Sequence, residues 1–187
     1  MKKGTFILIA VIAVIAIIAF SCVGTYNSLV AQRENVDTQY SAIETQLQRR
    51  IDLIPNIVNT VKGYAAHESE VFGAVSDARA RLAGASTKEE AAEADSELTS
   101  AVSRLLMIAE NYPDLKADTQ FTALTDELAG TENRIAVARK DYNDAAKTYN
   151  TQIKTFPKVI IANLFGFEKV EYFEAAEGAK SAPQVNF

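Results

Sequence analysis

Two residue types on which many catalytic and metal sites depend are nearly absent from this sequence. Its 187 residues include one cysteine, Cys22, and one histidine, His67. Soft-metal sites need several Cys or His ligands, and di-iron sites in helical bundles use paired Glu-x-x-His motifs, so neither kind of site is expected. We interpret His67, which has no second ligand near it in sequence, as a surface or interface residue.

Phosphate-binding, hydrolytic and nucleic-acid-binding motifs are missing as well. The eight glycines are scattered and form no phosphate-binding loop. No serine lies in a G-x-S-x-G turn. The net charge is −5 and there is no block of Lys and Arg, whereas nucleic acids are bound by concentrated positive charge. The sequence therefore predicts a protein that is not an enzyme, with no catalytic residue, no cofactor, no metal and no nucleic-acid partner.

One long apolar run, Thr5–Val23, follows directly on Met1-Lys2-Lys3. Its 19 residues carry no charge, and as a helix they would span about 28 Å, close to the roughly 30 Å hydrocarbon core of a bilayer. We predict an uncleaved single-pass anchor that contacts the lipid bilayer through Thr5–Val23. Residues 1–25 would then form the membrane anchor and residues 26–187 a helical domain.

Two other interpretations of this run stay open. A cleaved signal peptide has an apolar region of about 7–15 residues that ends in small side chains, whereas Phe20 is bulky. A lipoprotein signal would make Cys22 the lipidated residue. Ser21 suits that interpretation, but Ala19 and Phe20 are poor neighbours for it.

The charges around the run predict its orientation. Lys2, Lys3 and the amino terminus precede it, and the first charge after it is Arg33, followed by Glu34. Because positive charges next to a span are retained in the cytoplasm, we expect a cytoplasmic N-terminus and an exported body in the cell membrane.

Heptad repetition is clearest from Asp118 to Phe156, a helix that Pro157 should end. Large residues recur every seven positions, with mostly smaller residues between them, as interlocking helices require. The large residues are Phe121, Leu128, Ile135, Tyr142, Tyr149 and Phe156, and the interleaved ones are Leu124, Thr131, Ala138, Ala145 and Gln152.

Three further helices are predicted before this one. The first continues the apolar run to a chain reversal near Asp52. The second begins with Asp52 as its N-cap and Pro55 in its first turn, and it ends at Gly84 in the left-handed conformation. The third begins with a capping box at Ser86 or Thr87. The alternative to the reversal is a single long helix kinked at Pro55.

The predicted fold is all-α, with an N-terminal transmembrane helix followed by an antiparallel up-and-down four-helix bundle. Short links between helices of similar length favour antiparallel neighbours. The final segment, 157–187, is apolar up to Phe173 and then polar. We predict that Val159–Phe173 is an apolar strap that covers the end of the bundle, and the alternative is a patch that contacts the membrane or a partner.

Several charged residues fall on positions that would face a neighbouring helix. With a reversal near Asp52, Arg33 would lie close to Glu68, and a partly buried pair there could fix the register of the two helices. Other residues invite the same interpretation, unless they form solvated pairs along one helix face. They are Arg49, Arg50, Glu132, Arg139 and Asp141.

Short motifs follow one another in a specific order along most of the chain. They are Tyr26-Asn27-Ser28-Leu29-Val30, Gln48-Arg49-Arg50-Ile51-Asp52-Leu53-Ile54-Pro55-Asn56, Val61-Lys62-Gly63-Tyr64, Glu110-Asn111-Tyr112-Pro113-Asp114-Leu115-Lys116, Glu132-Asn133-Arg134-Ile135-Ala136-Val137-Ala138-Arg139, Asp141-Tyr142-Asn143, Tyr149-Asn150, Phe156-Pro157, Phe165-Gly166-Phe167 and Tyr172-Phe173. This set resembles the LemA family, and the resemblance covers essentially Tyr26 to Phe187.

The resemblance implies a bacterial membrane-anchored helical bundle without established activity or agreed catalytic residues. Members of the family that the chain resembles are often encoded beside membrane metallopeptidases, and distant members are associated with magnetosome membranes. We expect a non-enzymatic scaffold or adaptor of the cell envelope with protein partners there; the alternative is an envelope hydrolase or a regulator of a membrane peptidase. The recurrent residues, which we interpret as structural first, are Arg49, Arg50, Asp52, Pro55, Asn133, Arg139, Tyr142 and Asn143.

Overall fold

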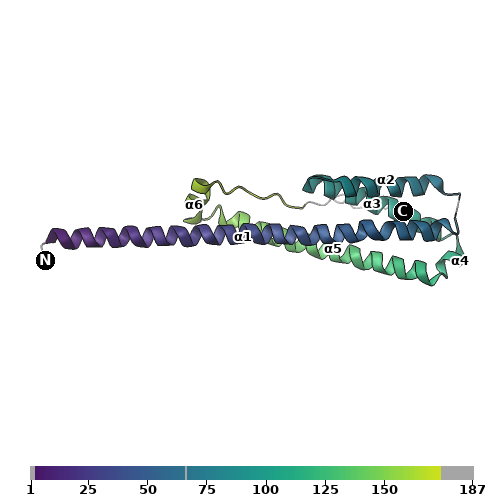
Figure 1. Ribbon diagram of the computed structural model, residues 1–187, viewed down its shortest axis with the longest axis horizontal. Helices are drawn as coiled ribbons and strands as arrows, with labels where there is room; N and C mark the ends of the chain where they lie inside the picture. The colour runs from purple at the N-terminus through teal and green to yellow at the C-terminus, as the bar shows by residue number, and fades with distance from the viewer. Residues whose placement is uncertain (1–2, 66, 174–187) are drawn as a thin grey trace, which may run out of the picture. The chain divides into compact units, whose positions relative to one another are not determined.

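The computed structural model describes residues 3–65 and 67–173, and in this part of the chain it contains helices and no strand, as predicted (Figure 1). Lys2, used above to predict orientation, and the polar end of the tail, 174–187, lie outside the described residues. The helices are α1 (Lys3–Lys62), α2 (Ser69–Gly84), α3 (Lys88–Ala109), α4 (Pro113–Lys116), α5 (Thr119–Gln152) and α6 (Lys158–Phe165).

The described chain packs as two compact units. Unit 1 comprises residues 3–39 and 141–172, and unit 2 comprises residues 40–140 and Phe173. Helices α1 and α5 each contribute to both units. The predicted boundary between residues 25 and 26 is a division between lipid and water, which packing does not test, and it stays a prediction.

Helix α1 begins with the apolar run. Among the described helices it is the one long and apolar enough, by length and composition, to cross a membrane. Its large side chains from Phe6 to Val23 are exposed, with Phe20 reaching 84 %. The protein's own atoms therefore do not cover this surface.

The predicted chain reversal near Asp52 is wrong, because α1 continues through Pro55 as a single long helix. A proline inside a helix lacks the N–H group that would bond to the carbonyl four residues earlier, which here belongs to Ile51. Nε of Arg79 on α2 donates a hydrogen bond to that carbonyl at 2.8 Å. The acceptor freed by the proline is thus satisfied by a neighbouring helix, and α2 begins only at Ser69.

The turn between α2 and α3 matches the prediction at the start of α3 but not at the end of α2. Thr87 Oγ1 accepts the backbone N–H of Glu90 at 3.1 Å, and Glu90 Oε2 accepts the backbone N–H of Thr87 at 3.2 Å, which completes the predicted capping box. Gly84 is not left-handed, contrary to the prediction, because it is the last residue of α2 and the chain leaves through extended backbone at Ala85. Within the described chain the positive φ is found at Gly166, after α6.

Helix α5 confirms the heptad pattern over most of its length. Its start is capped by Asp118, whose Oδ1 accepts the backbone N–H groups of Gln120 at 2.7 Å and Phe121 at 3.0 Å. The buried heptad residues are Phe121, Leu128, Ile135, Tyr142 and Tyr149.

The predicted end of this helix at Phe156 is wrong. Helix α5 ends at Gln152, and Phe156 is 77 % exposed. Backbone N–H groups of Lys154 and Thr155 bond three residues back instead of four, which tightens and closes the last turn. Helical backbone is also disfavoured for the residue before a proline, so the chain must leave the helix before Pro157.

In unit 1 the segment after α6 is held along α5 by hydrogen bonds. Buried Asn150 donates its Nδ2 to the carbonyl of Val170 and accepts the N–H of Val170 through Oδ1, both at 2.8 Å. Tyr142 donates its O–H to the carbonyl of Glu171 at 2.7 Å. The residues after α6 are thus attached to α5, and the covering of the bundle end by Val159–Phe173 stays a prediction, as does its contribution to stability.

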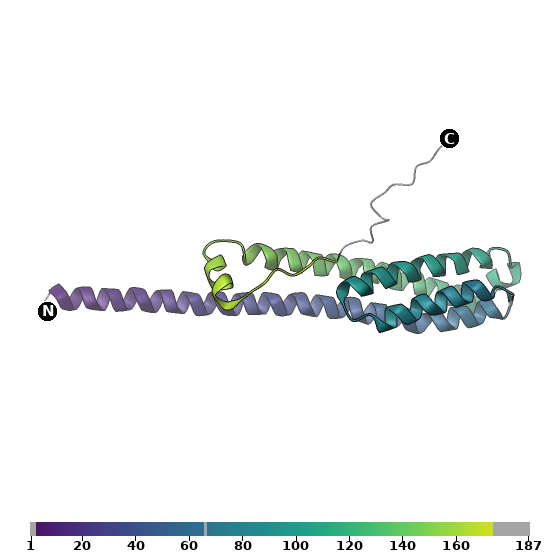
Figure 2. The same cartoon turned by 90° about the horizontal axis from the view of Figure 1, so that it is seen from above.

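In unit 2, α2 and α3 pack against each other as neighbours (teal in Figure 2). Side chains also connect α1 with the other helices of this unit, for example Arg49 with Glu127 of α5 at 2.6 Å. The antiparallel up-and-down four-helix arrangement remains a prediction in its details.

Candidate functional site

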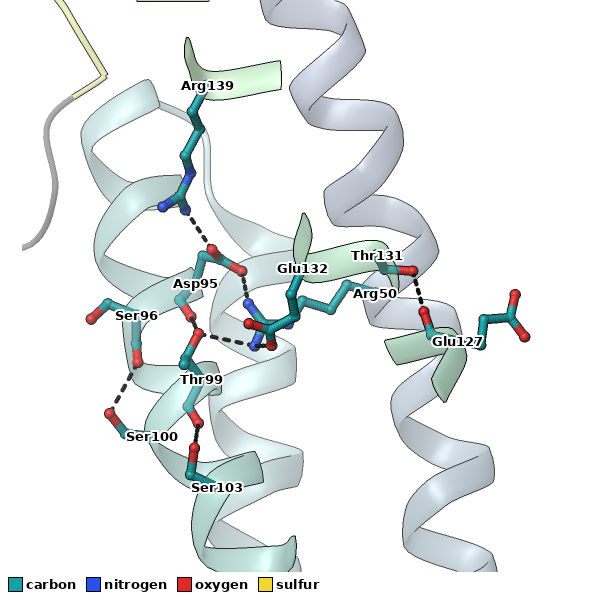
Figure 3. A network of polar contacts seen from close by, with 10 residues as sticks. All are labelled: Arg50, Asp95, Ser96, Thr99, Ser100, Ser103, Glu127, Thr131, Glu132 and Arg139. Atoms are coloured by element: carbon teal, nitrogen blue, oxygen red, sulfur yellow. Dashed lines mark hydrogen bonds and ion pairs between the residues drawn. The ribbon is translucent and has the colours of Figure 1, made fainter. Parts of the chain in front are cut away.

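A partly buried cluster of charged side chains in unit 2 connects three helices (Figure 3). Its centre is Arg50 of α1, which is only 1 % exposed. Nη1 of Arg50 donates to Asp95 Oδ1 of α3 at 2.5 Å. Its Nη2 donates to Glu132 Oε1 of α5 at 2.6 Å and to Thr99 Oγ1 of α3 at 2.9 Å. One side chain thus contacts two other helices.

Asp95, which is 3 % exposed, is held from two sides. Its Oδ2 accepts a hydrogen bond from Nη2 of Arg139 on α5 at 2.5 Å. The guanidinium of Arg139 also lies over the ring of Phe173, 4.6 Å from the ring centre. With Glu132, the cluster contains two arginines and two carboxylates, so its formal charges balance. This balance matters because an unpaired buried charge is strongly unfavourable.

Helical periodicity explains why these charged groups are buried. On α1, Arg50 lies three residues after Leu47 and four before Ile54, both of which are buried on the same face. On α3, Asp95 lies three residues before buried Leu98. Each charge therefore occupies a position on an apolar stripe, and the two positions meet where the helices pack.

The chemistry of the cluster suits helix attachment more than catalysis. Arginine keeps its proton in proteins, so neither guanidinium is a useful acid or base near neutral pH. Both oxygens of Asp95 are occupied by arginine N–H donors, and such charge-assisted bonds are strong. The buried Nε atoms of Arg50 and Arg139 have no hydrogen-bond partner, which costs some of this stability. Within residues 3–65 and 67–173, no group of three or more His, Cys, Asp or Glu side chains could hold a metal ion.

The cluster includes three of the five additional charged residues singled out by the sequence analysis. Of the other two, Arg49 pairs with Glu127 at the surface, and Asp141 is exposed. The three in the cluster are Arg50, Glu132 and Arg139. His67 is exposed, as predicted for a surface residue.

The predicted pair of Arg33 and Glu68 is wrong. Nε of Arg33 donates to Asp37 Oδ2 on its own helix at 3.2 Å, and Glu68 is the residue that precedes α2. The prediction required a reversal near Asp52, which α1 does not make. Asp95 was not among the predicted residues, although its position on the apolar stripe of α3 was the available signal.

Perturbed carboxylates lie at the beginnings of helices α3 and α5. The backbone N–H of Phe121 and the O–H of Tyr64, which lies 2.9 Å from Oδ2, lower the pKa of Asp118. Hydrogen bonding to Asp118 correspondingly raises the pKa of Tyr64. Hydrogen bonds from Ser86 and then Thr87 lower the pKa of Glu90. These shifts follow from helix capping, which favours the ionised carboxylate at a helix N-terminus.

One surface hollow in unit 2 contains an exposed ion pair. A hollow over α2 and α3 is lined by Arg81, Glu97 and Arg104, among others. Arg81 Nη1 and Glu97 Oε2 pair with each other at 2.7 Å, and both side chains are exposed. A catalytic site needs a nucleophile, acid or base aimed at a common point, and this hollow offers an ordinary surface ion pair.

Comparison with known proteins identifies the family. The model of the LemA family matches residues 39–187. Magnetosome protein MamQ 2 of Paramagnetospirillum magneticum is 29% identical over 200 residues, which cover 92% of this chain and 74% of that protein. Protein LemA of Metamycoplasma hominis is 27% identical over 177 residues, which cover 94% of this chain and 80% of that protein. Since the match extends over most of its length, the chain belongs to the LemA family.

Proposed function

We propose that this chain is a single-pass membrane protein whose helical body acts as a non-enzymatic scaffold or adaptor at the cell envelope. The observation that carries the proposal is the exposed apolar surface of α1 from Phe6 to Val23. Apolar surface of this extent is unfavourable in water, and a bilayer is the solvent that suits it. Similarity to proteins named for the magnetosome, a membrane compartment, supports a role at a membrane.

The adaptor role is supported by how the body uses its charges. An internal cluster of ion pairs connects α1, α3 and α5 through Arg50, Asp95 and Arg139. Side chains fixed in this way hold helices in a defined arrangement, which a binding scaffold requires. They also leave none of these groups available for reaction with a substrate.

Cysteine labelling tests the anchor and its orientation. In a Cys22→Ser chain, Asn35→Cys places one thiol on an exposed position of α1 beyond the apolar run. A membrane-impermeant maleimide should label this thiol in intact cells if the body is exported. Labelling only after the membrane is opened would reverse the orientation. A diacylglyceryl group on Cys22 of the native chain would refute the uncleaved anchor and identify the protein as a lipoprotein.

Crosslinking in living membranes tests the adaptor role. The full chain should recover defined envelope proteins that a control carrying only residues 1–25 on a neutral tag does not recover. Identical sets from both chains would refute an adaptor role for the body. Hydrolysis of envelope material by the purified full chain would replace the proposal with the enzymatic alternative.

A further inference from the structure

Helix α6 and the residue stretch before it expose a group of large apolar side chains. Ile160 and Leu164 are four residues apart, which places them on the same face of α6, and Leu164 is 72 % exposed. Phe165 and Phe156 add two exposed aromatic rings. Isolated exposed apolar residues are ordinary, but a group of four within ten residues forms a contiguous candidate for contact.

Helix α6 lies beside the part of α1 that follows the apolar run (Figure 2, α6 in yellow-green). In unit 1 the ring of Tyr26 is 4.9 Å from the ring of Phe165 and 5.6 Å from the ring of Phe167. Tyr26 is three residues beyond Val23, which corresponds to about 4.5 Å along a helix axis. Contacts within one unit therefore hold α6 at the level where the apolar run ends.

We propose that α6 is an interfacial helix that lies on the same membrane that α1 crosses. Ile160, Leu164 and Phe156 would insert among the lipid headgroups and the upper acyl chains, as the apolar faces of such helices do. Tyr26 and Phe165 would lie at headgroup depth, where aromatic rings are favoured. The inference rests on the proposed function, because α1 must be the anchor that brings α6 to the surface.

The opposite face of α6 explains how the helix is presented to lipid. Ile161 and Ala162 are buried, and the bonds between Asn150 and Val170 secure the segment that follows α6. The helix is therefore fixed to the protein by one side, and its other apolar side remains free. Because α1 already holds it near the bilayer, insertion is an intramolecular event with a high effective concentration.

The local charges suit a membrane surface that presents anionic headgroups. Between Asp144 and Glu168 the sequence contains three lysines and no acidic residue. On α1 no charge occurs between Val23 and Arg33. Lys158 bonds to Gln152, so a cation lies at the start of α6, where lipid phosphates would be its counterions.

Depth-dependent fluorescence quenching tests the inference on the full chain. In a Cys22→Ser chain, Leu164→Cys is labelled with bimane and reconstituted in phosphatidylcholine–phosphatidylglycerol vesicles that carry nitroxide lipids. Val14→Cys, at the middle of the apolar run and exposed, is the deep control. Asn35→Cys, which is 12 residues and about 18 Å beyond Val23 along the helix, is the aqueous control.

We expect the label at position 164 to lose fluorescence mainly to nitroxides near the headgroups, and the label at position 14 mainly to nitroxides deep in the acyl chains. The label at position 35 should lose no fluorescence to either kind of nitroxide. Adding Ile160→Asp to the Leu164→Cys chain should abolish the loss at position 164, because a carboxylate on the inserted face opposes burial.

The possible failures are distinguishable. Quenching at position 14 without quenching at position 164 overturns the interfacial helix, keeps the anchor and leaves the apolar face to a protein partner. Absence of quenching at position 14 overturns the anchor itself. Quenching at position 164 that survives Ile160→Asp overturns insertion through this face.

Discussion

Replacing Asp95 with alanine should destabilise unit 2 far more than replacing Glu97, two residues later on the same helix. Asp95 is buried between Arg50 and Arg139, so the alanine variant removes the carboxylate that both guanidiniums contact and leaves Arg50 with the half-exposed Glu132. Removing one member of a buried ion pair costs about 3–5 kcal/mol. Glu97 pairs with Arg81 at 2.7 Å, but both side chains are exposed, so Glu97→Ala should cost about 0–1 kcal/mol.

The free energy of unfolding of the full chain in detergent is obtained from urea titrations followed by circular dichroism. Arg50→Met combined with Asp95→Ala tests whether the two residues act as a unit. Each single change already breaks the pair. The double variant should therefore lose less free energy of unfolding than the two single variants added together, with a coupling energy of about 0.5–3 kcal/mol. A loss for Asp95→Ala within about 1 kcal/mol of that for Glu97→Ala would refute the reasoning.

Three further changes test other parts of the structure. Ile135→Ala on α5 should lower the free energy of unfolding by about 2–5 kcal/mol because it leaves a cavity; exposed Val137→Ala is the control, and equal losses would contradict a buried stripe. Asn150→Ala should deprive the N–H and C=O of Val170 of partners, at about 1–3 kcal/mol each, and limited proteolysis should then cut the segment after α6 faster; unchanged cleavage would count against its attachment to α5. Since the folded protein lowers the pKa of Asp118, this carboxylate stabilises the fold above its ordinary pKa, and the contribution is lost as the pH falls through the folded value. Asp118→Asn should therefore flatten the acid side of the stability curve, whereas superimposable curves would exclude this role.

Features that depend on neighbouring residues along one helix could be predicted from the sequence. The heptad residues Phe121 to Tyr149 are buried, and the capping box of Thr87 and Glu90 forms as expected. Both depend on spacings of three, four or seven residues, which the helix itself determines. The all-helical fold follows from the same kind of local pattern, whereas the family was indicated by the resemblance of ordered motifs.

The position of the first turn could not be predicted in this way. Pro55 is a strong local signal for a helix boundary, and the preference for a reversal near Asp52 rested on it. The helix continues because Arg79, 28 residues later, satisfies the carbonyl of Ile51. That compensation depends on tertiary contact, which local propensity does not contain. The incorrect pairing of Arg33 with Glu68 followed from this one error.

The buried charge cluster was partly predictable for a similar reason. Arg50, Glu132 and Arg139 could be selected because they fall on helix faces otherwise occupied by core residues. Asp95 lies on a helix rich in acidic residues, so its charge alone did not distinguish it from its solvated neighbours. Only the packing of α3 against α1 and α5 shows that this one carboxylate meets two arginines.

The proline in α1 also makes the docking of α2 specific to one position. In a regular helix each interior carbonyl already accepts a hydrogen bond within the helix. A neighbouring helix therefore meets the same backbone at every turn and has no preferred position along it. Pro55 opens a single acceptor at Ile51, and Arg79 is placed to use it. Displacing α2 by one helical turn, about 5.4 Å, would leave that acceptor unsatisfied and move the arginine to a stretch of backbone with nothing to accept its proton. The missing backbone hydrogen bond at Pro55 thus favours one alignment of α2 on α1 over alignments shifted by a turn, which apolar contacts alone would distinguish poorly.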